Sequence, residues 1–167
     1  MKVLLLGDTH GSVDDSILEL AAGMELVVHT GDIGSASVLS VLKSSCGNVL
    51  AVAGNNDVTE KWPAGDHHAL SKLPESLQIN LPGGVLAIEH GHQIWETNNY
   101  HIRLRQKYPD SQAIAYGHTH IRRIDTMIYP WVINPGAAGR IRTKGGASCV
   151  VLTAGLTRWS AREFVVA

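Results

Sequence analysis

Five short apolar runs divide this chain, and residues that bind metal ions well follow each of them directly. The runs are Val3–Leu6, Leu26–Val28, Val49–Ala53, Val85–Ile88 and Ala113–Tyr116. Short continuous apolar runs are typical of strands that are covered on both faces. The carboxyl ends of such strands in an open α/β sheet meet at one crevice. The pattern therefore predicts an α/β protein with a polar site at one end of its strands.

The segments between these runs predict outer helices and further strands. Helical patterns cover residues 14–23 and 98–107. A further helical pattern starts at Ser35 or Ser37 as N-cap and ends at Gly47, whereas residues 58–73 read as a polar loop. Residues 77–81 and 85–88 flank a turn and predict a hairpin. The chain after residue 120 reads as strands, at 123–128, 131–133, 147–152 and 158–165. We therefore expect one domain, residues 1–167, with two sheets and helices on the outside.

Charge and hydropathy exclude several functional classes. Fourteen Lys and Arg against 15 Asp and Glu leave a net charge of −1, so no overall attraction to nucleic acid is expected. No apolar stretch is long enough to span a bilayer, and the N-terminus enters a strand at once instead of reading as a signal peptide. Cys46 and Cys149 are far apart and show no metal or redox spacing. We expect a reduced, cytoplasmic protein with both thiols packed as small apolar residues.

Seven side chains after the apolar runs are candidate metal ligands: Asp8, His10, Asp32, Asn55, His90, His118 and His120. Seven donors exceed what one divalent ion needs, so they predict two ions sharing a site, and hence metal-assisted hydrolysis. Mixed nitrogen and oxygen donors without thiolate favour Mn, Fe, Zn, Co or Ni over Mg or Ca. We expect two divalent ions, with manganese as the first candidate.

The spacing of the acidic residues suggests how two ions are shared. Asp8 and His10 lie two positions apart, so in an extended segment their side chains point to the same face. Asp32 has two carboxylate oxygens and is the natural bridge between ions that lie ~3.5–4 Å apart. The neutral amide oxygen of Asn55 limits the negative charge that collects in the crevice.

Five motifs in this order resemble the calcineurin-like metallophosphoesterases: Gly7-Asp8-Thr9-His10-Gly11, Gly31-Asp32, Gly54-Asn55-Asn56-Asp57, His90-Gly91-His92 and Gly117-His118-Thr119-His120. The chain length and Asn134-Pro135-Gly136-Ala137 are similar to the small bacterial and archaeal phosphodiesterase branch, which includes Vps29-like proteins. The resemblance covers nearly the whole chain. It implies a four-layer α/β/β/α sandwich of two mixed sheets flanked by helices.

The resemblance also implies a mechanism and a set of ligands. One ion is expected at Asp8, His10, Asp32 and His120, and the other at Asp32, Asn55, His90 and His118. A hydroxide that bridges the ions is expected to attack the phosphorus of a small phosphate ester, most simply a phosphodiester. A homodimer is an expectation from the resemblance alone.

The proton donor for the leaving group departs from the family pattern. Many members have histidine where this chain has Asn56, which donates a hydrogen bond but no proton at neutral pH. General acid catalysis contributes roughly 10²–10⁴-fold, so we expect good leaving groups, another acid or slow turnover. His92 is a candidate substitute acid, phosphate contact or support for the ligands. Asp57 is expected either to orient a ligand histidine or to stabilise its turn.

Two other histidines are expected to lie outside the metal site. His29 lies inside an apolar strand and is expected to be a packed, hydrogen-bonded core residue, whereas His101 is expected to face solvent. Two rival functions remain open. A Vps29-like protein-binding scaffold fits the replacement of the usual acid by Asn56, and a nuclease is disfavoured because no basic stripe is apparent.

Overall fold

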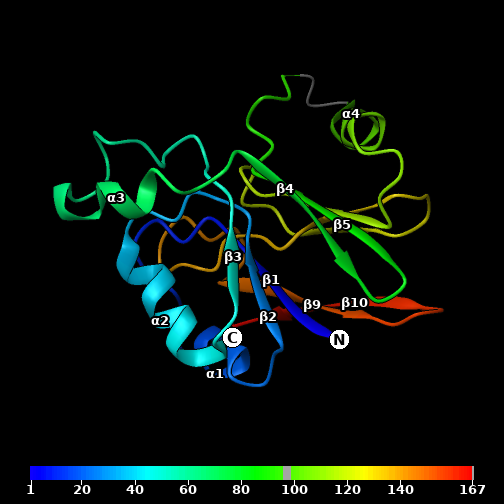
Figure 1. The fold of residues 1–167 in the computed structure, drawn as a ribbon, viewed down its shortest axis with the longest axis horizontal. Coiled ribbons are helices and arrows are strands. Elements are labelled where there is room, and N and C mark those ends of the chain that lie inside the picture. Colours follow the sequence, from blue (N-terminus) through cyan, green and yellow to red (C-terminus); the bar gives the residue numbers. More distant parts are fainter. Residues whose placement is uncertain (96–98, 167) are drawn as a thin grey trace.

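The computed structural model describes residues 1–95 and 99–166, and its strands form two five-stranded sheets (Figure 1). The first sheet has the order β10-β9-β1-β2-β3, in which β1, β2 and β3 are parallel. Its strands are β1 (Lys2–Leu6), β2 (Leu26–His29), β3 (Val49–Ala51), β9 (Ser148–Ala154) and β10 (Trp159–Val165). The late strands β9 and β10 therefore extend the sheet that the N-terminal segment begins.

The second sheet has the order β4-β5-β6-β8-β7, with β5, β6 and β8 parallel. Its strands are β4 (Ser76–Leu81), β5 (Gly84–Glu89), β6 (Ala113–Ala115), β7 (Arg123–Asp125) and β8 (Trp131–Asn134). The predicted hairpin is confirmed, because β4 pairs antiparallel with β5. Both sheets are mixed, since each also carries antiparallel strands.

Three apolar layers hold the sheets and helices together. Side chains from both sheets, such as Val3 and Ile88, fill the space between them. Helices α1 (Asp15–Ala21) and α2 (Ala36–Cys46) cover the outer face of the first sheet, and α4 (Tyr100–Lys107) covers the second (Figure 1). The predicted four-layer α/β/β/α sandwich is confirmed.

The ends of the helices partly follow the sequence signals. Asp14 caps α1 by accepting a hydrogen bond from the backbone nitrogen of Ser16 at 3.0 Å. The expected capping of α2 by a serine side chain is wrong: the carboxylate of Asp66 accepts from the backbone nitrogen of Ala36 at 2.9 Å, and the hydroxyl of Ser35 contacts that of Ser37. A residue 30 positions away thus supplies the cap because the fold carries it to the helix start.

The segment predicted as a polar loop contains two short helical turns, η1 (Ala64–Asp66) and α3 (His67–Leu70). These turns are too short to show a periodic apolar pattern in the sequence. Leu70, which is 8% exposed, holds them in place by packing into the apolar cluster between the first sheet and its helices. Strands β3 and β7 end earlier than expected. The start of the helix predicted at residue 98 lies outside the described residues. Among the residues that the structure describes, no helix has the length and apolar character needed to cross a membrane.

Candidate metal centre

The parallel pairing brings the ends of the apolar runs to one place. In the first sheet Leu6 pairs with His29, which pairs with Ala51, so three strands end side by side. In the second sheet Ile88 pairs with Ala115. All seven predicted ligands follow these strand ends, and the structure brings them together in two overlapping groups.

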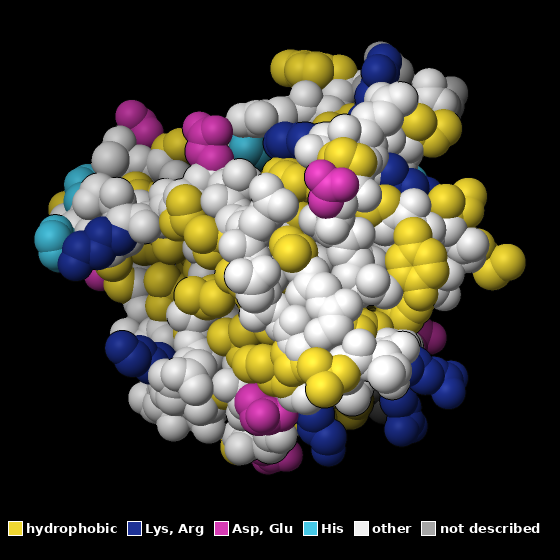
Figure 2. Space-filling model, turned by 45° about the vertical axis from the view of Figure 1, so that its right-hand side comes forward, with side chains coloured by type: hydrophobic (Ala, Val, Ile, Leu, Met, Phe, Trp, Pro, Cys, Tyr) yellow, Lys and Arg dark blue, Asp and Glu magenta, His cyan; other side chains and the backbone are white. Residues whose placement is uncertain are grey.

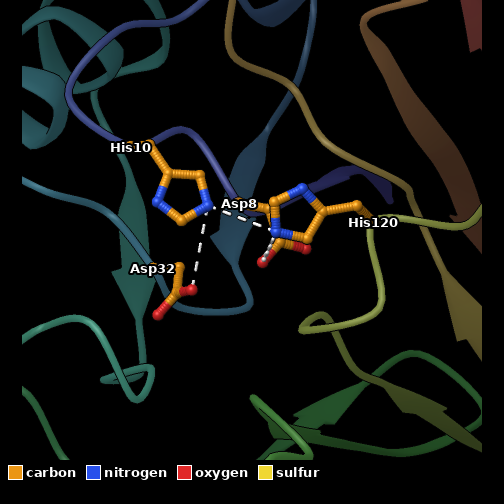
Figure 3. Close-up of side chains that lie close together, drawn as sticks. All are labelled: Asp8, His10, Asp32 and His120. Atoms are coloured by element: carbon orange, nitrogen blue, oxygen red, sulfur yellow. Dashed lines mark hydrogen bonds and ion pairs between the residues drawn. The ribbon is translucent and has the colours of Figure 1, made fainter. Parts of the chain in front are cut away.

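The first group contains Asp8, His10, Asp32 and His120, with one ligand atom of each lying within 4.8 Å of all the others (Figure 3). The Nε2 atom of His10 lies 3.8 Å from Oδ2 of Asp32, and that of His120 lies 3.5 Å from Oδ1 of Asp8. Figure 3 shows the four side chains pointing toward one another, with Asp8 and His10 from the loop after β1 and Asp32 and His120 from two other loops. This is the set expected for the first ion.

The second group surrounds the amide oxygen of Asn55. That oxygen lies 3.1 Å from Nε2 of His90 and 3.0 Å from Nδ1 of His118. Oδ1 of Asp32 lies 3.4 Å from Nε2 of His90. Asp32 therefore turns one oxygen to each group, the arrangement expected of a carboxylate that bridges two cations.

Backbone carbonyls set the orientation of two ligand histidines. Nδ1 of His90 lies 2.9 Å from the carbonyl oxygen of Thr30, and Nδ1 of His120 lies 3.0 Å from that of Arg142. Because a carbonyl oxygen only accepts hydrogen bonds, each Nδ1 carries the proton. In the neutral ring Nε2 then presents its lone pair to the centre, as a metal-ligating histidine does.

The centre is built on backbone in a rare conformation. Positive φ angles between 46° and 69° occur at five of its residues: Asp8, His10, Asp32, His118 and His120. The left-handed region costs a residue with a Cβ roughly 1–2 kcal/mol. The expectation that Asp8 and His10 share a face of an extended segment is wrong, since both are left-handed and the chain turns between them. Strain of this kind concentrates at functional sites.

Two glycines leave room for the ligands. A Cβ at Gly54 would lie 2.3 Å from Oδ1 of Asp32, and one at Gly31 would lie 2.8 Å from Nδ1 of His90. Neither position accepts a side chain without displacing a ligand. The glycines that precede the acidic and amide ligands are thus required by close approach.

The charges of the centre suit a bound cation. Asp8 is fully buried, its Oδ2 has no hydrogen-bond partner among the described residues, and burial raises its pKa to about 6. Burial also disfavours the charged forms of Asp32 and His90, but their mutual contact outweighs it. The pKa of Asp32 therefore lies below its usual value and that of His90 above. A divalent ion beside Asp8 would satisfy its free oxygen, so these residues fit the metals that the donor set implies.

Asn56 holds the bridging carboxylate in place. Its backbone nitrogen donates to Oδ1 of Asp32 at 2.8 Å, and its Nδ2 donates to Oδ2 at 2.6 Å. The exposed ammonium of Lys61 donates to the amide oxygen of Asn56. Lys61 was not predicted as a site residue, because its only signal in the sequence is a cation in the loop five residues after Asn56.

Asp57 joins the loops beneath the centre. Its Oδ1 accepts from the backbone nitrogens of Ile33 and Gly34 and from Nε1 of Trp62, at 2.9, 3.1 and 2.9 Å. Its Oδ2 accepts from the backbone nitrogen of Gly54 at 2.8 Å. Of the two roles expected for Asp57, these contacts support loop stabilisation.

His92 lies beside the second group. Its ring centroid is 5.5 Å from that of His90 and 6.3 Å from that of His118. Its Nδ1 is buried without a hydrogen-bond partner among the described residues. Burial lowers the pKa of His92, which favours a neutral ring near pH 7.

Two further histidines, His29 and His101, give one confirmed prediction and one correction. His29 is fully buried, and its Nε2 lies 2.9 Å from the hydroxyl of Thr9, as expected for a core residue. The expectation that His101 faces solvent is wrong: its side chain is 14% exposed and lies between Asp125 and Tyr116, at 2.9 and 3.0 Å. Asn134 donates to the carbonyl oxygen of Gly117 at 2.8 Å and so anchors the loop that carries the last two ligands.

Residues 1–155 match the family model of the calcineurin-like phosphoesterase superfamily domain. The chain belongs to this superfamily. Among its relatives is Phosphodiesterase MJ0936 of Methanocaldococcus jannaschii, 26% identical over 144 residues, or 81% of this chain and 83% of that protein. The probable metallophosphoesterase YsnB of Bacillus subtilis is 26% identical over 159 residues, or 92% of this chain and 84% of YsnB.

Solved structures share the fold of this calcineurin-like phosphoesterase. A Vps29 from Entamoeba histolytica complexed with zinc superposes with a TM-score of 0.79 at 19% identity, covering 99% of this chain and 92% of the other. A structure described as a novel archaeal phosphodiesterase gives a TM-score of 0.71 at 23% identity and covers 99% and 100%. At these identities the likeness establishes the fold.

Proposed function

We propose that this calcineurin-like phosphoesterase hydrolyses small phosphodiesters with two divalent ions, manganese first, at the two ligand groups. The observation that carries the proposal is Asp32, whose Oδ2 faces the first group and whose Oδ1 faces the second. The relative named as a phosphodiesterase supports the ester class. When bound, such ions lower the pKa of a coordinated water and offset charge on the phosphoryl oxygens.

The protein's own residues orient the site and limit its chemistry. Asn56 holds Asp32 through two hydrogen bonds, and Lys61 places a positive charge beside Asn56, where an anionic phosphate can approach. Neither Asn56 nor a neutral His92 supplies a proton to the leaving oxygen at pH 7. We therefore propose a preference for esters of acidic alcohols, whose leaving oxygens need little protonation.

Hydrolysis of bis-p-nitrophenyl phosphate tests the proposal. The metal-free protein should gain activity with Mn, Ni, Co or Zn, and Asp32→Ala should lower it at least about 100-fold, the usual cost of removing a key electrostatic group. Asp110→Ala, at an exposed position in the turn after α4, is the matched control. If the protein binds metal but hydrolyses the ester with none of these four ions, the enzymatic proposal is contradicted.

The second candidate function is a protein-binding scaffold, which Asn56 favours because it replaces the usual acid. The intact ligand set opposes it, since a pure binding surface has no need of seven converging donors. A nuclease is disfavoured further: Lys and Arg side chains on the face in Figure 2 lie in scattered groups among apolar and acidic ones, without a stripe. The cytoplasmic location, the single domain over residues 1–167 and the homodimer stay predictions.

A further inference from the structure

A hollow of about 520 Å³ opens beside the metal centre, on the side of α4 and β7. Sites of about 300–1,000 Å³ are typical of small-molecule binding. His118 and Thr119 line it, so one of the predicted ligands forms part of its wall. A substrate whose phosphorus lies at the centre can therefore extend one ester group into this hollow.

One wall of the hollow consists of neutral side chains joined by hydrogen bonds, with His101 and Tyr116 at its centre. Nδ1 of His101 faces the carboxylate of Asp125 and therefore carries its proton, which leaves Nε2 to accept from the hydroxyl of Tyr116. Burial lowers the pKa of His101, which keeps the ring neutral. The guanidinium of Arg105 lies 2.9 Å from Asp125 and offsets its charge. Rings of Tyr100 and Tyr116, with centroids 5.0 Å apart, back this wall.

Two cations lie at the same hollow. Lys144 donates to the carbonyl oxygen of Thr119 at 3.0 Å, which leaves two further N–H donors on its ammonium. Arg123 is an exposed residue of the edge strand β7. No acidic residue lines the hollow in the described part of the chain. Cations without facing carboxylates favour an anionic ligand group.

We propose that this hollow binds one ester arm of the phosphodiester substrate, and that this arm carries a second anionic group recognised by Arg123 and Lys144. The inference rests on the proposed function and adds a substrate class: diesters with an apolar body and a second phosphate or equivalent anion. The tyrosine and isoleucine side chains of the wall, including Ile94 and Ile121, suit the apolar body.

A matched pair of substrates tests this class. Thymidine 5′-(p-nitrophenyl phosphate) is compared with the same ester bearing a 3′-phosphate, since both release p-nitrophenolate. Two partly solvated ion pairs each strengthen binding about 1.4- to 5-fold, so the 3′-phosphate should lower KM roughly two- to thirtyfold, and less at high salt. The ratio of the KM values of the two esters should fall toward one in the double variant Arg123→Gln, Lys144→Gln. Lys43→Gln, an exposed position on α2, should keep the ratio.

Binding gives a readout that does not depend on turnover. Thymidine 3′-monophosphate should bind the metal-free wild-type protein measurably more tightly than the Arg123→Gln, Lys144→Gln double variant in calorimetric titrations. Equal KM values of the two esters for the wild-type protein would overturn the inference. So would a KM ratio and a Kd for thymidine 3′-monophosphate that are unchanged in the double variant. If neither ester nor bis-p-nitrophenyl phosphate is hydrolysed, the proposed function fails, while the titration still decides whether the hollow binds the anion.

Discussion

The Nε2 atoms of His10 and His120 lie 3.2 Å apart, although 110 positions separate the two residues in the chain. Nδ1 of His120 donates to the carbonyl oxygen of Arg142, so Nε2 of His120 presents a lone pair. Without a cation the contact needs a proton on Nε2 of His10. With a cation both lone pairs can serve as ligands, and burial lowers the pKa of His10, which favours that neutral form.

Manganese should therefore stabilise the fold. At a metal concentration about 100 times the Kd, binding adds about 2.7 kcal/mol, which corresponds to a rise in Tm of roughly 5–10 °C for a chain of this size. Thermal unfolding with and without metal measures the rise. His120→Ala should lose most of it, whereas His68→Ala, exposed on α3, should keep it. An unchanged response in His120→Ala would contradict its assignment as a ligand.

Replacing Asn56 by histidine should restore a proton donor. Asn56→His is expected to raise kcat at least about tenfold on a diester with a poor leaving group, and much less on bis-p-nitrophenyl phosphate. Parallel kinetics on the two esters measure the difference. Equal changes for both esters would mean that residue 56 acts by holding Asp32 and not by its missing proton.

Gly54 should tolerate no side chain. In Gly54→Ala the new Cβ would lie 2.3 Å from Oδ1 of Asp32, so either the loop or the ligand must move. We expect a loss of roughly 1–3 kcal/mol in unfolding free energy and weaker metal binding. Gly65→Ala is the control, because a Cβ there meets nothing within 4 Å. Unfolding curves that coincide for the two variants would refute the close approach.

Asp8 should make the stability of the metal-free protein depend on pH. Burial raises its pKa from 3.8 to about 6 in the folded state. The protonated carboxyl therefore stabilises the fold below about pH 4, and this contribution is lost as the pH rises through about 6. Asp8→Asn stays neutral, so its advantage over the wild type should be small near pH 4 and on the order of 3 kcal/mol at pH 7.5.

Thermal unfolding of both proteins across this pH range measures the difference. Groups far from Asp8 titrate alike in both proteins, whereas the substitution also removes a negative charge that helps to raise the pKa of His90. A difference that shrinks as the pH rises would show that the pKa of Asp8 is lowered by its neighbours instead. With manganese present the order should reverse, since only the wild type supplies the carboxylate ligand.

Replacing Asp57 should lower the stability of the fold and not the rate of the chemical step. Asp57→Asn keeps one acceptor oxygen and turns an amide nitrogen toward backbone N–H groups that now bond to the carboxylate. We expect a loss of roughly 3 kcal/mol in unfolding free energy. Denaturant unfolding measures it, with exposed Asp110→Asn as the control. A fall in kcat without loss of stability would instead support a direct role in catalysis.

The seven candidate ligands, and their order at the polar ends of the strands, could be predicted from local sequence patterns. These features are local, because an apolar run bounded by glycine predicts a buried strand, and parallel strands bring residues such as Asp8 and Asp32 to one edge. The family assignment rests on the same local motifs in order. The charge balance and the core position of His29 were also readable from neighbouring residues alone.

The geometry in which these residues meet depends on the packing of the whole fold. The left-handed backbone at Asp8 and His10 depends on hydrogen bonds from their nitrogens to the carbonyls of Gly31 and Asp32, which belong to another strand end. Likewise, the cap of α2 by Asp66 and the burial of His101 depend on contacts between segments far apart in sequence. No local pattern encodes such contacts, because they form only when the two sheets pack and bring those segments together.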